Sequence, residues 1–163
     1  MTPVDDGRRD FDFLHGNWEV RNLRLARRLQ DSEDWQEFEA FATVRPILHG
    51  LGNVDTISAE NIPGIGAFEG FTLRLFDPAQ GSWTIFWAST GSPGHLDPPL
   101  TGRFSNGRGV FDGEDLLDGR LIHVRFEWTS DGADHARWQQ AFSGDAGQTW
   151  EINWVMEFTR APD

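Results

Sequence analysis

Histidine is the side chain best suited to bind a metal or exchange protons near neutral pH. The chain has five of them: His15, His49, His95, His123 and His135. No two form an H-x-H or H-x-x-x-H pair, the spacings that would place two imidazoles on one face of a strand or a helix. The sequence therefore predicts no metal site, unless distant strands bring His123, which stands in the middle of an expected strand, next to other ligands.

Sequence motifs for nucleophilic and nucleotide chemistry are also missing. Without cysteine the chain has no disulfide, no thiolate metal site and no catalytic thiol. It contains no G-x-S-x-G elbow, no G-x-G-x-x-G fingerprint and no P-loop. Asp and Glu number 26, so no particular carboxylate pair stands out for acid–base catalysis. The sequence consequently assigns no catalytic residue and identifies no cofactor.

Aromatic side chains are the most informative residues for a ligand site. The chain has 8 Trp, 13 Phe and no Tyr, and many of them recur at every second position. We expect five tryptophans to approach one another in the interior, with Gln140 as a polar residue among them: Trp18, Trp87, Trp128, Trp138 and Trp154. These side chains either fill the interior as a packed core or line a cavity for one ligand, and both interpretations stay open.

Three charged or titratable residues in expected strands complete the candidate ligand site. Arg74 and Arg125 would anchor a ligand carboxylate if a bulge or the opposite parity turned them inward, and would otherwise lie on the surface. A perturbed His123 or Arg125 in the interior would favour an enzyme. The candidate ligand-binding residues are thus Trp18, Arg74, Trp87, His123, Arg125, Trp128, Trp138, Gln140 and Trp154.

The elements that must position these side chains are β-strands, because apolar residues alternate with polar ones. The clearest run is 150–158, where Trp150, Ile152 and Trp154 share one parity. The runs 122–128 and 136–142 repeat the pattern, and the turn-rich segments between the three runs predict a meander. Further strands are expected over 18–29, 54–59, 68–76, 83–88 and 102–111, the last broken into two arms at "SNGRG".

Two segments are less regular. Residues 31–44, "DSEDWQEFEAFATV", fit a helix or a strand, and we expect a strand. A short helix is expected near Arg8 to His15, with Asp10 as its cap, where it could plug one end of a barrel. The long Gly- and Pro-rich loop over 88–100 could form a lid at the other end.

Many strands joined by short turns, with almost no helix, leave a sandwich or a barrel as compact solutions. We expect an antiparallel up-and-down barrel of about eight to ten strands, which removes its edges by closing. Nothing divides the chain, so residues 1–163 are expected to form one domain.

Charge excludes several partners. The formal net charge is -12 at pH 7, and the isoelectric point is about 4.7. This excess of negative charge repels phosphate backbones and anionic membranes. Arg21, Arg24, Arg27 and Arg28 alternate with leucines and are interpreted as the polar face of a strand. No apolar run resembles a signal peptide or a membrane span, so we expect a cytoplasmic protein with neither nucleic acid nor membrane as partner.

One turn motif is specific. Ser143 to Trp150 reads S-x-D-x-G-x-T-W and resembles the Asp-box of sialidases and related propellers. Ser and Asp would satisfy turn amides, and Gly would supply a positive φ. A propeller needs several blades, so the resemblance implies a structural turn and not glycosidase chemistry.

A second resemblance covers most of the chain. "FDFLHGNWEV", "LHGLGNVD", "DPAQGSW" and "SGDAGQTWEINWVMEFTR" together resemble a family of uncharacterised bacterial proteins with a calycin-like, lipocalin-type barrel. The pair Gly16-x-Trp18 is similar to that of lipocalins and fatty-acid-binding proteins, in which such a Trp closes the base of the barrel. By analogy with nitrobindin-type barrels, haem binding is kept as a minor alternative.

Together these observations predict a protein that binds a small apolar or amphipathic molecule in a Trp-rich barrel. One alternative is a cofactor-free isomerase, cyclase or hydrolase that uses the same cavity. Another is a solid barrel that acts as a protein-interaction module, with Trp35 and Phe41 as a face for a homodimer.

Overall fold

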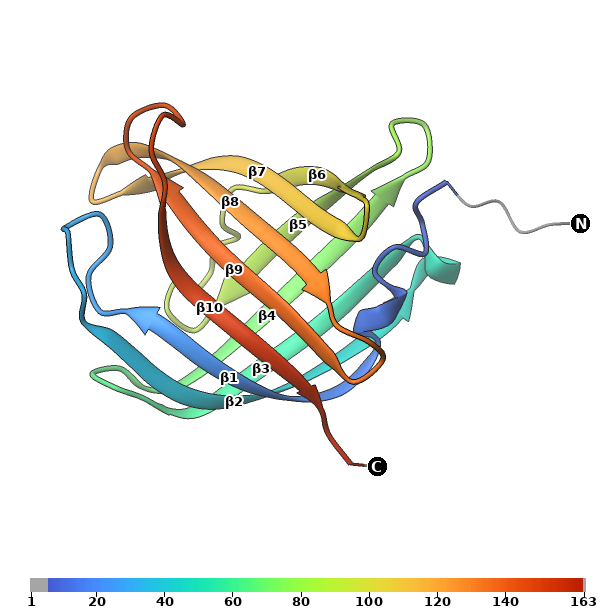
Figure 1. The fold of residues 1–163 in the computed structure, drawn as a ribbon, viewed down its shortest axis with the longest axis horizontal. Helices are drawn as coiled ribbons and strands as arrows, with labels where there is room; N and C mark the ends of the chain where they lie inside the picture. Colours follow the sequence, from blue (N-terminus) through green and yellow to red (C-terminus); the bar gives the residue numbers. More distant parts are fainter. Residues whose placement is uncertain (1–5, 163) are drawn as a thin grey trace, which may run out of the picture.

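Ten antiparallel strands form a closed barrel in the computed structural model of the protein, which describes residues 6–162 (Figure 1). In chain order they are β1 (Gly16–Leu25), β2 (Trp35–Ile47), β3 (Gly52–Ile62), β4 (Gly66–Asp77), β5 (Ser82–Ser89), β6 (Leu100–Ser105), β7 (Arg108–Leu117), β8 (Arg120–Ser130), β9 (His135–Ser143) and β10 (Glu151–Arg160). Each strand pairs with its neighbours in sequence, and β10 pairs with β1 to close the sheet. The predicted all-β, antiparallel barrel is therefore confirmed.

Strand alternation decides which side chains face the interior. In β2, whose sequence fits either a helix or a strand, Phe38, Ala42 and Val44 are buried, whereas Phe41 of the opposite parity is exposed. The expectation of a strand in this segment is confirmed. It holds because a period of two buries one complete apolar row against the core.

One strand is shorter than expected, and another segment is divided into two strands as expected. β1 ends at Leu25 and does not continue to Leu29. The two expected arms around "SNGRG" are β6 and β7, joined by Asn106 and Gly107. Both turn residues have positive φ, 53° and 76°, which a tight hairpin requires.

The N-terminal helix expected over Arg8 to His15 is wrong. The segment forms only a single 3-10 turn, η1 (Asp12–Leu14), and no side chain caps it. Burial explains the difference, because Phe11 and Leu14 are both inserted into the end of the barrel, where they are 1% and 0% exposed. So short a segment gains more from this burial than from helical hydrogen bonds. Among residues 6–162, no helix is long and apolar enough to cross a membrane.

The N-terminal segment closes one end of the barrel, at the right in Figure 1. The ring of Phe11 packs edge-on against Trp83 and Phe104, with centroid distances of 5.0 and 4.9 Å. The indole N–H of Trp83 donates to the carbonyl of Gly7 at 3.2 Å. A second 3-10 turn, η2 (Leu48–Gly50), connects β2 and β3 at the same end.

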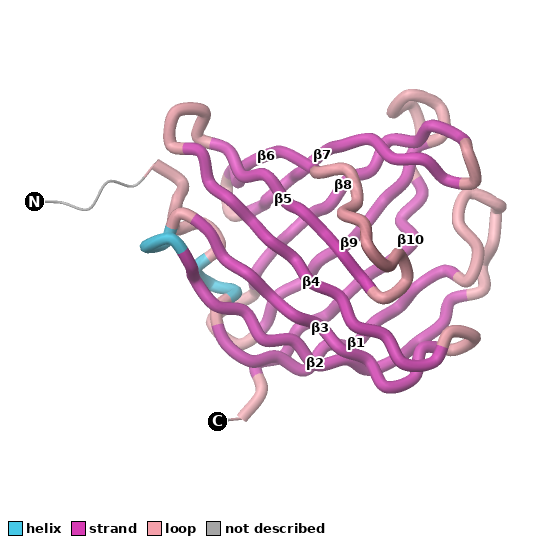
Figure 2. The backbone as a smooth tube through the Cα atoms, turned by 180° about the vertical axis from the view of Figure 1, so that it is seen from behind, coloured by secondary structure: helices cyan, strands magenta, loops and turns pink. Residues whose placement is uncertain are grey.

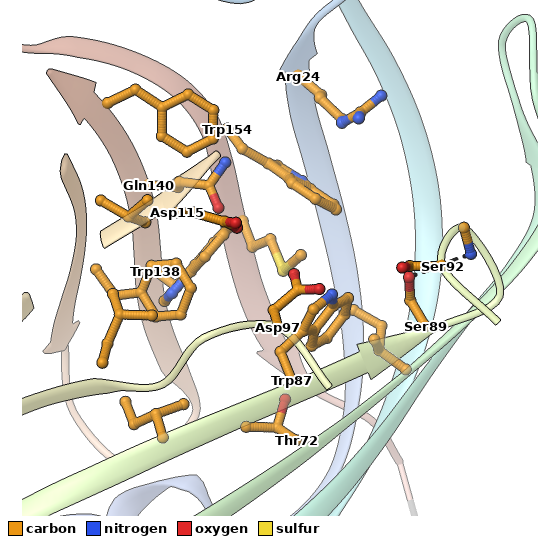
Figure 3. Close-up of a pocket in the computed structure, with 18 of the residues that line it drawn as sticks. Arg24, Thr72, Trp87, Ser89, Ser92, Asp97, Asp115, Trp138, Gln140 and Trp154 are labelled. Carbon is orange, nitrogen blue, oxygen red and sulfur yellow. Dashed lines mark hydrogen bonds between the residues drawn. The ribbon is translucent and has the colours of Figure 1, made fainter. Parts of the chain in front are cut away.

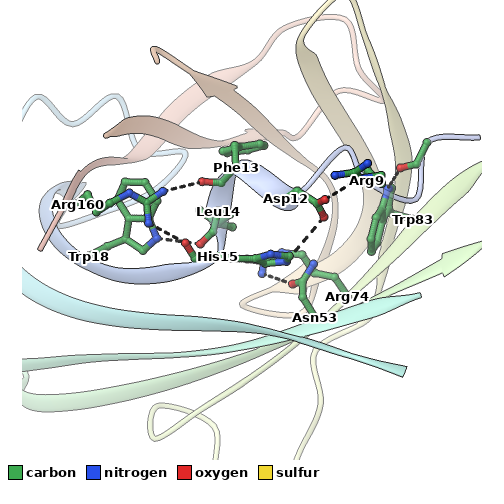
Figure 4. A network of polar contacts seen from close by, with 11 residues as sticks. Arg9, Asp12, Phe13, Leu14, His15, Trp18, Asn53, Arg74, Trp83 and Arg160 are labelled. Atoms are coloured by element: carbon green, nitrogen blue, oxygen red, sulfur yellow. Dashed lines mark hydrogen bonds and ion pairs between the residues drawn. The ribbon is translucent and has the colours of Figure 1, made fainter. Parts of the chain in front are cut away.

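The Gly16-x-Trp18 motif belongs to this closed end (Figure 4). Trp18 is fully buried, and its indole N–H donates to the carbonyl of Leu14 at 2.8 Å. Arg160 from β10 stacks 4.2 Å from the Trp18 ring centroid and donates to the carbonyl of His15 at 2.8 Å. Gly16 has a φ of 119°, and a Cβ there would lie 2.6 Å from the Arg160 guanidinium. The absence of a side chain at Gly16 therefore gives the Arg160 guanidinium the space in which it joins the first strand to the last.

A β-bulge interrupts the alternation of β10. The pairing with β9 shifts between Ile152 and Trp154, so that Asn153 is an extra residue in the strand. Trp154 consequently faces inward, whereas Ile152, of the same sequence parity, is 42% exposed. The expectation that one uninterrupted row from Trp150 to Phe158 faces the core is corrected here.

The opposite end carries the connections β1–β2, β3–β4, β5–β6, β7–β8 and β9–β10 (Figure 1). The longest is the segment 90–99 between β5 and β6, which runs back beside β5 (Figure 2). Backbone bonds hold it at both ends: Thr90 N–H donates to the Glu69 carbonyl at 2.9 Å, and Asp97 N–H donates to the Trp87 carbonyl at 2.9 Å. This loop therefore forms part of the rim of the barrel.

Candidate functional site

The interior of the barrel contains a cavity of about 690 Å³. Its lining reaches Arg28 after β1, Ile65 between β3 and β4, and Ser92 between β5 and β6, so the cavity extends to the end opposite the N-terminal segment. Part of this lining is drawn in Figure 3. The volume falls in the range of roughly 300–1,000 Å³ that is usual for small-molecule sites.

Aromatic rings make up much of the cavity wall. Trp87, Trp128, Trp138 and Trp154 all line it. Trp138 packs edge-on against Trp154, with centroids 5.7 Å apart, and against Phe126 at 5.1 Å. Because these rings pack against one another, the wall presents rigid apolar surfaces to a ligand.

Buried amide side chains fix the orientation of this wall. Trp154 Nε1 donates to Asn22 Oδ1 at 2.9 Å, and Asn22 is fully buried. Gln140 Nε2 donates to Oδ1 of Asn153 at 2.9 Å. The bulge in β10 therefore has a local role, because the extra residue Asn153 supplies the partner for Gln140.

A buried ion pair lies deeper in the barrel, towards the closed end. Arg74 Nη2 is 2.6 Å from Asp55 Oδ2, and Arg74 Nη1 donates to Asn53 Oδ1 at 2.8 Å. The guanidinium also lies 5.1 Å from the ring centroid of Phe11 and 5.4 Å from that of Trp128. Arg74 is 3% exposed, so its charge is compensated inside the protein by a carboxylate, an amide and two aromatic rings.

Two further arginines line the cavity near its open end. Arg24 has the parity of Trp18 and Asn22 and therefore points inward from β1; its guanidinium lies 5.0 Å from the ring centroid of Trp154. Arg28 lies 5.9 Å from the ring centroid of Phe142. Burial, and to a lesser extent repulsion by Arg28, lowers the pKa of Arg24 to about 10, so this guanidinium is still charged at neutral pH.

Carboxylates occupy another part of the rim. Asp97 comes from the loop between β5 and β6, and Asp115 points inward from β7 (Figure 3). Burial, followed by repulsion from Asp115, raises the pKa of Asp97 above its ordinary value. The rim therefore separates its charges, with one arginine at the end of β1 and one in the segment that follows it, and with carboxylates on the β5–β6 loop and β7.

Six of the nine candidate residues from the sequence are brought together around the cavity. They are Arg74, Trp87, Trp128, Trp138, Gln140 and Trp154. Trp18 lies in the closed end and is not part of the lining. Arg74 is inside the barrel and not on the surface, because Thr72 and Phe76, which share its parity, are also buried.

His123 and Arg125 do not reach the cavity. Both belong to the outward row of β8, where Arg125 donates to Asp112 at 2.7 Å and stacks 4.2 Å from the centroid of Trp150. Neither residue lines the cavity, because the inward row of β8 is formed by Ile122, Val124, Phe126 and Trp128.

The arginines and carboxylates of the rim were not expected from the sequence. Arg24 and Arg28 were expected on an outward polar face together with Arg21. Arg21 does face outward and bonds Glu37 at 2.7 Å. The parity that Arg24 shares with Trp18 was an available signal, because it places both residues on the inward row of β1.

Neither a metal site nor a known relative gives further information about the function of the cavity. Within residues 6–162, no group of three or more His, Cys, Asp or Glu is placed to hold a metal ion. None of the five histidines, all of them in the described part of the chain, lines the cavity. The chain matches no protein-family model, and no curated protein matches its sequence.

Proposed function

We propose that this protein binds a small apolar or amphipathic molecule inside the barrel. The observation that carries the proposal is the cavity of about 690 Å³, which reaches one end of the barrel and is lined by four tryptophans. Apolar surface that moves from water onto such walls contributes roughly 25 cal/mol per Å². Because the rings are already held in a fixed orientation, binding has a smaller entropic cost for ordering their side chains.

The alternatives find less support in the same geometry. A solid interaction module does not fit an interior with this much free volume. A haem ligated by histidine is not supported, because the lining contains no histidine. Asp97 is the titratable group that a cofactor-free enzyme would use, but in the described part of the chain its carboxyl bonds no hydroxyl or imidazole that could act as a nucleophile or base.

We also propose that the barrel is calycin-like. The proposal is supported by Trp18, which closes the base of the barrel as the Gly-x-Trp resemblance implies, and by the up-and-down order of the strands. It places the ligand entrance at the end opposite Trp18.

A pair of variants one residue apart tests the binding proposal. Thr72 lines the cavity, whereas the adjacent Leu73 points to the outer face of β4. We expect Thr72→Phe to weaken binding of dansyl undecanoic acid, a fluorescent amphiphile, by about tenfold or more, which is about 1.4 kcal/mol. Leu73→Phe adds a ring outside the barrel and should leave the affinity unchanged. Equal affinities for both variants would contradict binding inside the barrel.

A further inference from the structure

Unpaired polar atoms inside the barrel mark positions where a ligand could supply a hydrogen-bond partner. Within residues 6–162, three buried side-chain nitrogens lack a hydrogen-bond partner: Arg24 Nε, Arg74 Nε and Asn153 Nδ2. Arg74 and Asn153 are otherwise satisfied, the first by Asp55 and the second by Gln140. Only Arg24 combines an unpaired buried donor with an uncompensated charge.

Arg24 has no anionic partner in the described part of the chain. Its one close contact with a charged or aromatic group is the stacking on Trp154, and Arg28 adds repulsion. A guanidinium that is partly removed from water without a carboxylate destabilises the empty protein. An anion supplied from outside would satisfy the free donors of its planar fork.

Arg28 strengthens the positive charge at this place. Its guanidinium is also half-buried, and burial lowers its pKa. Asp118 and Glu151 attract it, but neither is within ion-pair distance. The Glu151 carboxylate instead accepts the backbone N–H of Leu29 at 2.8 Å. Two arginines four residues apart in sequence thus lie at the rim of an apolar cavity, and neither forms an ion pair with a carboxylate of the described residues.

The rest of the rim restricts where an anion can lie. Asp97 and Asp115 repel one another and would repel a ligand anion. Asp97 is not stabilised by either rim arginine, because burial and Asp115 alone shift its pKa. A negatively charged ligand group therefore has one favourable position at the rim, beside Arg24 and Arg28.

We infer that the ligand is an amphipathic anion, with its apolar body between the tryptophans and a carboxylate bound at Arg24 and Arg28. This inference rests on the proposed function, because it assigns the chemistry of the same cavity. Arginine binds a carboxylate through two parallel hydrogen bonds, which fixes the direction in which the ligand enters. The head group lies at the open end, and the apolar end points towards Trp128 and Arg74.

Two probes that differ only in charge test the inference. Dansyl undecanoic acid carries a carboxylate, and its methyl ester has the same body without the charge. We expect the wild-type protein to bind the acid at least about tenfold more tightly than the ester. Added salt should weaken binding of the acid and leave the ester nearly unaffected.

Variants at the rim assign this preference to the two arginines. In Arg24→Gln and Arg28→Gln, the acid should lose most of its advantage while affinity for the ester stays the same. Arg27→Gln is the matched control, because Arg27 has the same charge, lies between them in sequence and is exposed. If an arginine variant does not fold, the acid–ester difference of the wild-type protein and its salt dependence still test whether the charge of the ligand is recognised.

The outcomes separate the two proposals. Binding of both probes with equal affinity, or an advantage of the acid that survives both rim substitutions, would overturn the anion inference and leave the binding function standing. Failure of both probes to bind would overturn the binding function itself.

Discussion

At the scale of single residues, the arginines inside the barrel fall into two groups. Arg74 and Asp55 neutralise one another deep in the molecule. Arg24 and Arg28 do not have such a partner among residues 6–162 and instead line the cavity. The first group belongs to the fold, and the second is available to a ligand.

The buried pair predicts a large and non-additive effect on stability. Arg74→Met should lower the free energy of unfolding by about 3–5 kcal/mol, because it leaves Asp55 buried without a partner. Asp55→Asn should have a cost of similar size. The double variant should lose much less than the sum of the two, since it removes both charges. Urea unfolding measures all three, and additive losses would contradict a coupled pair.

Asp145 in the Asp-box-like turn predicts a specific pH dependence. The side-chain hydroxyl of Thr149, its backbone N–H and then the Ser143 hydroxyl donate to this carboxylate and lower the pKa of Asp145 to about 2. Because the pKa in the folded state is below the unfolded value of about 3.9, the stabilisation is complete above that value and is lost as pH falls towards 2.

Carboxyl NMR of the folded protein tests this dependence directly. The Asp145 resonance should titrate near pH 2. The stability difference between the wild-type protein and Asp145→Asn should shrink as the pH falls through the same range. A titration midpoint near 4 would show that the turn hydrogen bonds do not form in solution.

At the scale of elements, the weakest seam of the barrel lies between β5 and β6. Only three residue pairs join them, Trp83 with Gly102, Thr84 with Thr101 and Ile85 with Leu100. The segment 90–99 runs along the rest of β5 in place of a full strand. On its other side β6 lies close to β7, and Gly102 permits this approach, because a Cβ at this position would lie 1.9 Å from the carbonyl oxygen of Val110.

Gly102→Ala should therefore destabilise the protein by about 1–3 kcal/mol, because backbone atoms of β7 must move to admit the methyl group. Gly91→Ala is the control, since its Cβ would meet nothing closer than 3.4 Å and its φ is not positive. Thermal unfolding of the two variants makes the comparison. Equal midpoints would show that the β6–β7 contact can relax at little cost.

The elements also show how far the sequence could be used for prediction. Alternation was sufficient for the closed barrel and for the inward positions of Trp128, Trp138 and Trp154, because each strand buries one complete row. It could not predict the bulge at Asn153, which has no composition signal and reverses Ile152. The N-terminal helix was wrong because burial of Phe11 in the barrel end depends on contacts distant in sequence.

The aromatic residues and Gln140 were the predictable part of the candidate site. Trp87 and Gln140 followed from strand parity, but an arginine on a strand is ordinarily a surface residue. The inward position of Arg74 depends on its partner Asp55 in β3. The parity of Arg24 places it on the inward row of β1, but the cavity that it lines exists only in the closed barrel. Such pairings across strands are not visible in a single sequence.

At the scale of the whole molecule, the two ends of the barrel have different tasks. The N-terminal segment, Trp18 and Arg160 seal one end. The other end opens into the cavity and carries the segregated charges of the rim. In a chain with a net charge of -12, the anion site that we propose at this local pair of arginines would give a ligand one place and one orientation.

The eight tryptophans provide the most direct test of ligand binding inside the barrel. Four of them line the cavity: Trp87, Trp128, Trp138 and Trp154. The other four lie outside the lining: Trp18, Trp35, Trp83 and Trp150. In a nitrogen–proton correlation spectrum, each indole N–H reports on its own surroundings.

The measurement is a titration of the labelled protein with dansyl undecanoic acid, followed at these indole resonances. We predict that the four cavity tryptophans shift together and saturate with one affinity, while Trp35 and Trp150 stay in place. Shifts confined to the exposed Trp35, or no shift of the cavity resonances at saturating probe, would contradict a ligand site inside the barrel.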